Sequence, residues 1–263
     1  RRVLNVDYLT KKIAPYSYII NKNECMKLPD KRYRTRYFYL TERQEYEYYN
    51  AKELLLANVD EFDSTTIYKL FTGLQQVVSG NVIISINPLK SRPMFNDPLD
   101  NPRIKTLLDE IDGVNEKIII WCKYKHEIND ICKVLRDKYG ESSVAQFYGD
   151  VNLKNRNIEI EKFKNEAQYL VANKVCGGYG LNLQFCSYMI YYSNDFNWAT
   201  RAQSEDRVHR LGQNKEIRIV DICAKSKIDE RIIKNLYCKE NLCDSFKREL
   251  KINRHNLSAW LDG

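Results

Sequence analysis

The sequence contains no long apolar run. No stretch of about eighteen consecutive apolar residues occurs among its 263 residues, which excludes a transmembrane helix. The amino-terminal segment, which opens Arg1-Arg2-Val3-Leu4, has no long apolar region after its charges, so it is not a signal peptide. We therefore expect no membrane partner. Because the chain also lacks an initiator Met, we expect it to be part of a longer protein.

The cysteines lack the spacing of a metal site. None of the eight forms a Cys-x-x-Cys pair. The pair closest in sequence, Cys238 and Cys243, has His255 twelve residues further on, which is a poor zinc signature. Others end apolar runs, such as the Ile-Ile-Ile-Trp-Cys run that ends at Cys122, where cysteine acts as a small hydrophobic residue. We expect no metal site and reduced thiols.

The sequence also lacks the glycine-rich loops that bind phosphate. No Gly-x-x-x-x-Gly-Lys-Ser/Thr motif occurs, so no P-loop lies in this chain. Gly178 and Gly180 are followed by Leu-Asn-Leu without a third glycine, which excludes a dinucleotide fingerprint. Residues 54–56 precede two acidic residues, as a Walker B strand would, but they follow a helical pattern. We interpret them as the end of a helix.

The charge balance is basic without being extreme. Lys and Arg total 42 against 35 Asp and Glu, which gives a net charge of +7. This balance weakly favours a polyanionic partner such as nucleic acid, although ordinary basic soluble proteins show it as well. Lys123 and Lys125 follow the apolar run at residues 117–122, where they could meet a phosphate backbone. A basic stripe at residues 31–36, with tyrosines interleaved, is equally well explained as a solvated face.

From about Gly113 onward, short β-branched runs alternate with helical patterns. Between the first two runs, Ile128, Ile131, Cys132 and Leu135 have the i, i+3, i+4, i+7 spacing of one helix face. Strand, helix and strand at this spacing predict βαβ units, and hence an α/β fold with a parallel sheet flanked by helices. The expected strands are residues 117–122, 143–148, 168–173, 188–193 and 217–222.

The first hundred residues have a different pattern. Residues 33–40 read as a strand, and a capping box at 41–44 opens a helix. A second helix ends before Gly80, the three prolines of 81–100 indicate a loop, and Asn101-Pro102 begins another helix. We expect two domains. Residues 1–100 would hold the leading strand and a mainly helical protrusion at 41–100, and residues 101–263 the main lobe.

One short segment combines basic and amide side chains at helical spacing. Gln203, Arg207 and Arg210 stand at i, i+4 and i+7 in Gln-Ser-Glu-Asp-Arg-Val-His-Arg-Leu-Gly-Gln, so we expect them on one helix face. Two guanidinium groups on one face suit phosphate oxygens. The plainer interpretation is a solvated helix on which the arginines pair with Glu205 and Asp206.

That segment resembles motif VI of the SWI/SNF-like ATPases, a branch of helicase superfamily two. Upstream segments agree in order: residues 177–183 resemble motif V, and residues 118–121 resemble the motif IV strand. Trp198, with Asp195 nearby, resembles the family's aspartate–tryptophan segment, although Ala199 and Thr200 follow where the family has proline. Further resemblance lies at Tyr148-Gly149 with Arg156 and Phe163, and at 227–232 with Lys239.

The resemblance implies the C-terminal RecA-like lobe of an ATP-dependent translocase on double-stranded DNA. Arg207 and Arg210 would be catalytic, and Gln203, Gly178 and Gly180 would bind nucleotide. ATP and Mg²⁺ would be held mainly by a first RecA-like lobe of the same protein, so we expect this chain alone to be inactive. Nucleic acid would be contacted by four residues, namely Lys123, Lys125, Asn182 and Trp198.

Two alternatives remain open at this point. A non-catalytic module that binds nucleic acid or protein would keep the same fold without the motor. An RNA helicase of the DEAD-box type would be expected to have His at Gln203 and Arg at Gln213, so the amides found there favour duplex DNA. The frequent Lys, Asn, Ile and Tyr are typical of an AT-rich genome, and we expect the cytoplasm of a bacterial or phage-infected cell.

Overall fold

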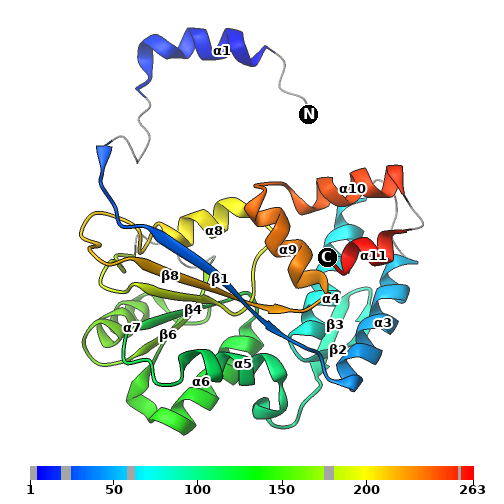
Figure 1. The fold of residues 1–263 in the computed structure, drawn as a ribbon, viewed down its shortest axis with the longest axis horizontal. Coiled ribbons are helices and arrows are strands. Elements are labelled where there is room, and N and C mark those ends of the chain that lie inside the picture. The colour runs from blue at the N-terminus through cyan, green and yellow to red at the C-terminus, as the bar shows by residue number, and fades with distance from the viewer. Residues whose placement is uncertain (1–4, 19–24, 58–62, 175–180, 254–255) are drawn as a thin grey trace.

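A computed structural model describes residues 5–18, 25–57, 63–174, 181–253 and 256–263 (Figure 1). Its centre is a six-stranded sheet of order β1-β8-β7-β4-β6-β5, in which every neighbouring pair is parallel. The predicted α/β fold with a parallel sheet is confirmed, and each of the five expected strands is present. The strands are β1 (Lys31–Phe38), β4 (Ile118–Cys122), β5 (Val144–Phe147), β6 (Tyr169–Asn173), β7 (Tyr188–Tyr191) and β8 (Ile217–Ala224).

Helices connect and cover these strands, and most begin at a side-chain cap. Thr41 forms the predicted capping box with Gln44, and the side chains of Asp63, Asn101 and Asn197 accept hydrogen bonds from the first turns of their helices. No helix among the described residues has the length and apolarity needed to cross a bilayer. The α-helices are α1 (Val6–Ile13), α3 (Glu42–Leu56), α4 (Ser64–Val78), α5 (Pro102–Ile111), α6 (Lys125–Tyr139), α7 (Leu153–Asn165), α8 (Trp198–Glu205), α9 (Ile228–Tyr237), α10 (Leu242–Ile252) and α11 (Leu257–Leu261).

The inner strands β4, β6 and β7 are buried along almost their whole length, whereas the edge strand β1 is largely exposed. In β4, Ile118 and Ile120 join the core that includes α5 and α6, while Ile119 and Trp121 join the core beneath α7. Successive side chains of a strand point to opposite faces, so a strand covered on both sides has apolar residues at every position. This requirement explains the continuous apolar run at 118–122, all of which is buried.

The protrusion contains a hairpin that the sequence analysis assigned to a loop. Residues 81–93 form two antiparallel strands, β2 (Asn81–Ile86) and β3 (Leu89–Pro93). Pro88 lies in the turn and Pro93 at the end of a strand, positions where a missing N–H breaks few ladder hydrogen bonds. The prolines that suggested a loop are thus compatible with the hairpin, and the loop prediction was wrong for this segment.

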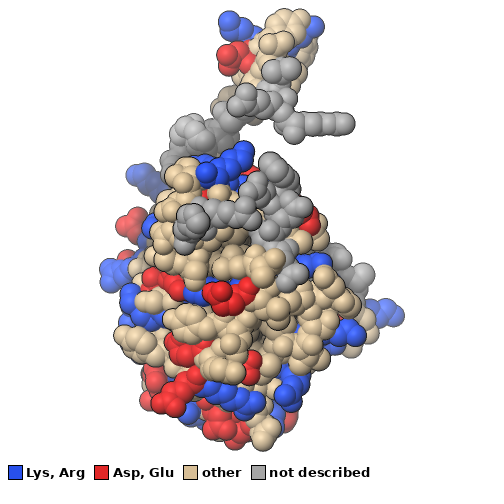
Figure 2. All heavy atoms as spheres, turned by 90° about the vertical axis from the view of Figure 1, so that its right-hand side faces the viewer, with Lys and Arg blue, Asp and Glu red and all other residues tan. Residues whose placement is uncertain are grey.

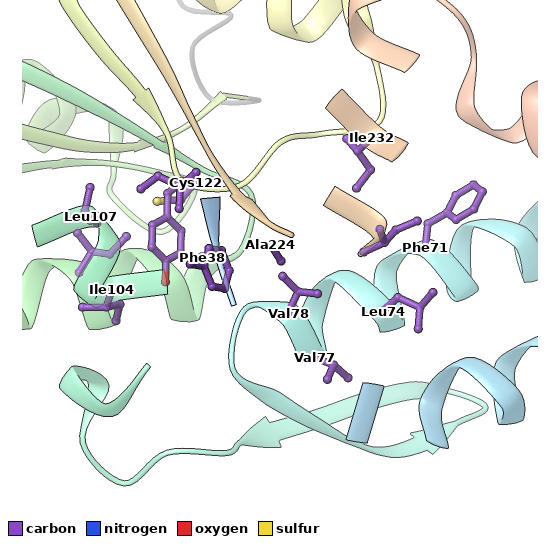
Figure 3. Close-up of a cluster of buried hydrophobic side chains, with 14 of the residues drawn as sticks. Phe38, Phe71, Leu74, Val77, Val78, Ile104, Leu107, Cys122, Ala224 and Ile232 are labelled. Atoms are coloured by element: carbon purple, nitrogen blue, oxygen red, sulfur yellow. The ribbon is translucent and has the colours of Figure 1, made fainter. Parts of the chain in front are cut away.

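The protrusion shares one continuous hydrophobic core with the sheet. Figure 3 shows Phe71, Leu74 and Val78 of α4 in the same buried cluster as Ala224 of β8 and Ile232 of α9. Strand β1 also pairs along its whole length with β8, so part of the segment 1–100 belongs to the main sheet. Seen from the side of α3 and α10, the surface mixes acidic and basic residues without a single basic patch (Figure 2).

Candidate nucleotide site

Helix α8 includes only the beginning of the segment 203–213, which contains the predicted nucleotide-site residues. It begins at Trp198, with Asn197 as the capping residue, and ends at Glu205. Gln203 therefore lies on the helix, whereas Arg207 and Arg210 lie in the turns that follow it. The prediction that all three project from one helix face is wrong.

Tertiary contacts explain why the helix ends there. The carbonyl of Glu205 accepts hydrogen bonds from the N–H groups of both Val208 (3.1 Å) and His209 (2.9 Å), which tightens the last turn. The carbonyl of Arg207 accepts from the N–H of Leu183 (3.1 Å), so it is engaged outside the helix. Val208 is fully buried and fixes the turn against the core on the α7 face. The arginine turn, residues 206–210, is consequently held by the lobe rather than by helical periodicity.

Neither arginine of this turn is paired with a carboxylate in the described part of the chain. The guanidinium of Arg210 donates to Oδ1 of Asn182, a neutral acceptor. The Arg207 side chain is half-buried, and its Nε has no hydrogen-bond partner among the described residues. The plainer interpretation, in which the two arginines pair with Glu205, is therefore not supported. Two cations without counter-ions on one turn are the arrangement that an external anion would complete.

Glu205 is engaged by other residues. Its Oε1 accepts from Nε of Arg201 (2.9 Å), and its Oε2 accepts from Nζ of Lys31 and the hydroxyl of Tyr33, each at 2.8 Å. Burial disfavours the charged form, but Arg201 and Lys31 outweigh it and lower the pKa of Glu205. The carboxylate therefore stays ionised, with both oxygens satisfied.

The sequence analysis missed Arg201, which is buried at the centre of this network. Its guanidinium donates to Asp221 through Nη1 (2.6 Å) and Nη2 (3.0 Å) and to Asn194 through Nη1 (2.7 Å), and it lies 3.5 Å from the Tyr191 ring centroid. Burial opposes the charge, yet Asp221 and Glu205 raise the pKa of Arg201. A signal was present, because Asp221 interrupts an apolar strand and a buried carboxylate requires a cation.

The remaining predicted site residues, apart from the two arginines and the two lysines, differ in how far the structure describes them and in what they contact. Gln203 is exposed on α8, and Gly178 and Gly180 lie outside the described residues. Trp198 is 40% exposed at the start of α8, with the amino group of Lys239 at 4.9 Å from its ring centroid. Asn182 is exposed and lies beside the arginine turn through its contact with Arg210. The roles expected for these residues stay predictions.

The two candidate lysines are already engaged within the protein. Nζ of Lys123 donates to Oε1 of Gln75 (2.9 Å) and lies 3.2 Å from the ring centroid of Phe196. Burial lowers the pKa of Lys123 to about 8, although Asp195 partly offsets the effect. Lys125 is exposed and forms an ion pair with Asp150. Lys123 thus joins the protrusion to the ends of the strands, whereas Lys125 forms its ion pair at the exposed surface.

Lys174, at the end of β6, is a buried amine whose ionisation should affect stability. It donates to the carbonyl of Ser193 (3.1 Å), and burial together with the nearby charge of Arg201 lowers its pKa to about 7 from an ordinary 10.5. Between these two values the unfolded chain binds more protons than the folded chain. The free energy of unfolding should therefore rise with pH in this window, by at most about 1.4 kcal/mol per pH unit for one group.

We expect Lys174→Met to flatten that rise. Urea unfolding at pH 7.0, 7.5 and 8.0 measures it, in an interval where Lys123 contributes less because its pKa is higher. Lys133→Met, a change at an exposed lysine, should leave the slope as it is in the unmodified chain. Equal slopes for all three proteins would show that Lys174 keeps its proton when folded.

Comparison with known proteins finds a matching family for part of this chain. Residues 102–212 match the family described as the helicase conserved C-terminal domain. The matched segment makes up less than half of the 263-residue chain. It contains β4 to β7, α8 and the arginine turn, and therefore every described candidate residue of the site.

Relatives of this chain include proteins named as ATP-dependent helicases. An uncharacterized ATP-dependent helicase of Bacillus subtilis, YqhH, is 32% identical over 156 residues, which are 59% of this chain and 28% of that protein. The chain thus spans less than a third of the length of that relative. The helicase match over residues 102–212 agrees with the helicase resemblance drawn from the sequence.

Two solved structures share the fold. The Sulfolobus solfataricus SWI2/SNF2 ATPase core in complex with dsDNA matches 97% of this chain and 56% of its own, with a TM-score of 0.68 and 21% identity. The C-terminal domain of the Sulfolobus solfataricus SWI2/SNF2 ATPase matches 89% of this chain and 93% of its own, with a TM-score of 0.57 and 19% identity. The chain therefore shares its fold with the C-terminal domain of this SWI2/SNF2 ATPase.

Proposed function

We propose that this chain is the second motor lobe of an ATP-dependent translocase on double-stranded DNA. The observation that carries the proposal is the arginine turn, where Arg207 and Arg210 lie without a carboxylate partner among the described residues. By contrast, the buried arginines Arg103 and Arg201 each have a carboxylate partner. The turn is thus prepared for an anion supplied from outside the lobe.

The proposed role of the turn is to stabilise charge on a triphosphate bound across the cleft between two lobes. Charge on the γ-phosphate oxygens grows as the terminal bond breaks, so guanidinium groups placed there act mainly on the transition state. Asn182 orients Arg210 through its hydrogen bond, and Gln203 presents its amide from the preceding helix. Closing and opening of the two lobes would then move the DNA.

The metal is assigned to the first lobe. We propose that Mg²⁺ is held there together with most of the nucleotide, as the resemblance to the SWI/SNF-like ATPases implies. The cysteines that the structure describes are free thiols, which agrees with the reducing cytoplasm that we propose for the protein.

Duplex DNA is the proposed nucleic-acid partner. One structural neighbour is a SWI2/SNF2 core solved with dsDNA, which supports this choice over RNA. On this chain the proposed contacts are Asn182, Trp198 and Lys125, all of which are exposed. Lys123 can take part only if its amino group leaves Gln75 and the Phe196 ring.

Binding of duplex DNA by the isolated chain should be weak and independent of sequence. Because the contacts would be to phosphates, affinity should fall steeply with salt, with a slope of about −0.9 per phosphate neutralised. Fluorescence anisotropy with two unrelated duplexes and a matched RNA duplex, from about 50 to 200 mM salt, measures this. Affinity that ignores salt, or that is higher for RNA, would argue against the proposed partner.

A further inference from the structure

Arg201 cannot itself contact a ligand, because its guanidinium is buried and already hydrogen-bonded within the protein. The side chain is 8% exposed, and all three of its nitrogens donate to protein oxygens. One flat side of the group rests on the Tyr191 ring. The residue nevertheless lies on α8, six positions before Arg207, which suggests an indirect role.

Glu205 connects Arg201 to the arginine turn. Its side chain receives the Nε–H of Arg201, and its backbone carbonyl receives the N–H groups of Val208 and His209. Any movement of the Glu205 backbone therefore also moves Val208 and His209 in the turn. The hydrogen bond from the N–H of Leu183 to the carbonyl of Arg207 is a second anchor of the turn.

We propose that Arg201 is a positioning residue that fixes the end of α8 and thereby places Arg207 and Arg210 for ATP hydrolysis. This inference rests on the function proposed above. Arg201 attaches the helix end to β8 through Asp221 and to the end of β7 through Asn194, both of which are buried. The turn thus takes its position from the central sheet.

The geometry requires a guanidinium rather than any cation. Arg201 reaches Glu205, Asn194 and Asp221 at once because its donors are spread over a planar fork. A lysine offers a compact ammonium, which can keep the charge pair with Asp221 but cannot hold Glu205 in the same way. Lys31 and Tyr33 still hold the other oxygen of Glu205, so the helix should persist with a shifted end.

The test is Arg201→Lys in the full-length protein, with DNA-stimulated ATP turnover measured well below the melting temperature. We expect kcat to fall by roughly 100-fold, the effect of about 1 Å of misplacement, while KM for ATP stays within about twofold. The matched control is Arg103→Lys, which alters a second buried arginine, paired with Asp229, whose contacts lie outside the arginine turn. It should lower the melting temperature and leave kcat unchanged.

The outcomes separate the positioning role from the proposed function. If Arg201→Lys retains full kcat while Arg207→Ala loses turnover, the positioning role is refuted and the function stands. If Arg207→Ala retains turnover, the proposed function itself fails. Equal losses of kcat in Arg201→Lys and Arg103→Lys would show that Arg201 contributes only to stability, and would refute the positioning role. Should Arg201→Lys fail to fold, Glu205→Gln weakens the same link, and unchanged kcat in that variant would refute the role.

Discussion

Replacing Arg207 or Arg210 by alanine in the full-length protein should reduce DNA-stimulated ATP turnover by on the order of 10³-fold or more. The expected loss is large because neither guanidinium forms an ion pair with a carboxylate of the described chain. In the proposed function, both can therefore pair with the γ-phosphate. Lysine at either position should rescue poorly, since an ammonium cannot present the same planar pair of donors.

The same variants should fold almost normally. Both arginines are only half-buried, and in the described chain neither forms an ion pair that its removal would break, so each change should alter stability by about 0–1 kcal/mol. The control is Arg248→Ala, which removes an exposed arginine paired with Glu240 and should leave turnover intact. An Arg207→Ala protein that melts early but hydrolyses ATP at the normal rate would assign the residue to structure.

The second large effect should come from Asp229→Ala. Oδ2 of Asp229 lies 3.0 Å from Nη2 of Arg103, which is 1% exposed, and the same oxygen accepts from the N–H of Ala224. Removing the carboxylate leaves a buried guanidinium without its counter-ion, at a cost of about 3–5 kcal/mol. For a chain of this size the melting temperature should fall by roughly 6–20 °C.

Thermal melting followed by circular dichroism measures this effect. Asp109→Ala, which removes an exposed carboxylate on α5, should change the free energy of unfolding by no more than about 0.5 kcal/mol. A drop of only one or two degrees for Asp229→Ala would mean that Ser79 and the Ile222 carbonyl, which also accept from Arg103, suffice to satisfy it.

The sheet was predictable because its signal is local and repeated. A strand buried on both faces must be apolar at consecutive positions, as residues 118–122 are, and the helices between the strands show their own period. The caps at Thr41 and Asn101 were predictable for the same reason, since each depends on residues within one turn.

The geometry of the site could not be predicted, because it depends on contacts between residues that are distant in the sequence. Helix α8 ends at Glu205 because Val208 is buried and the Arg207 carbonyl bonds to Leu183, more than twenty residues earlier in the chain. Spacing alone extended the helix through Arg210. The position of Lys123 could not be predicted either, because it depends on Gln75 of the protrusion. Residue types thus identified the chemistry, and long-range contacts determined the geometry.

The most direct test of the account is ATP turnover by separated and joined lobes. Turnover with saturating duplex DNA is measured for this chain alone, for the first lobe alone, and for the full-length protein. A site divided between two lobes predicts background rates for each part and DNA-stimulated hydrolysis only when they are joined. DNA-stimulated hydrolysis by this chain alone, abolished by Arg207→Ala and therefore not a contaminant, would contradict the account.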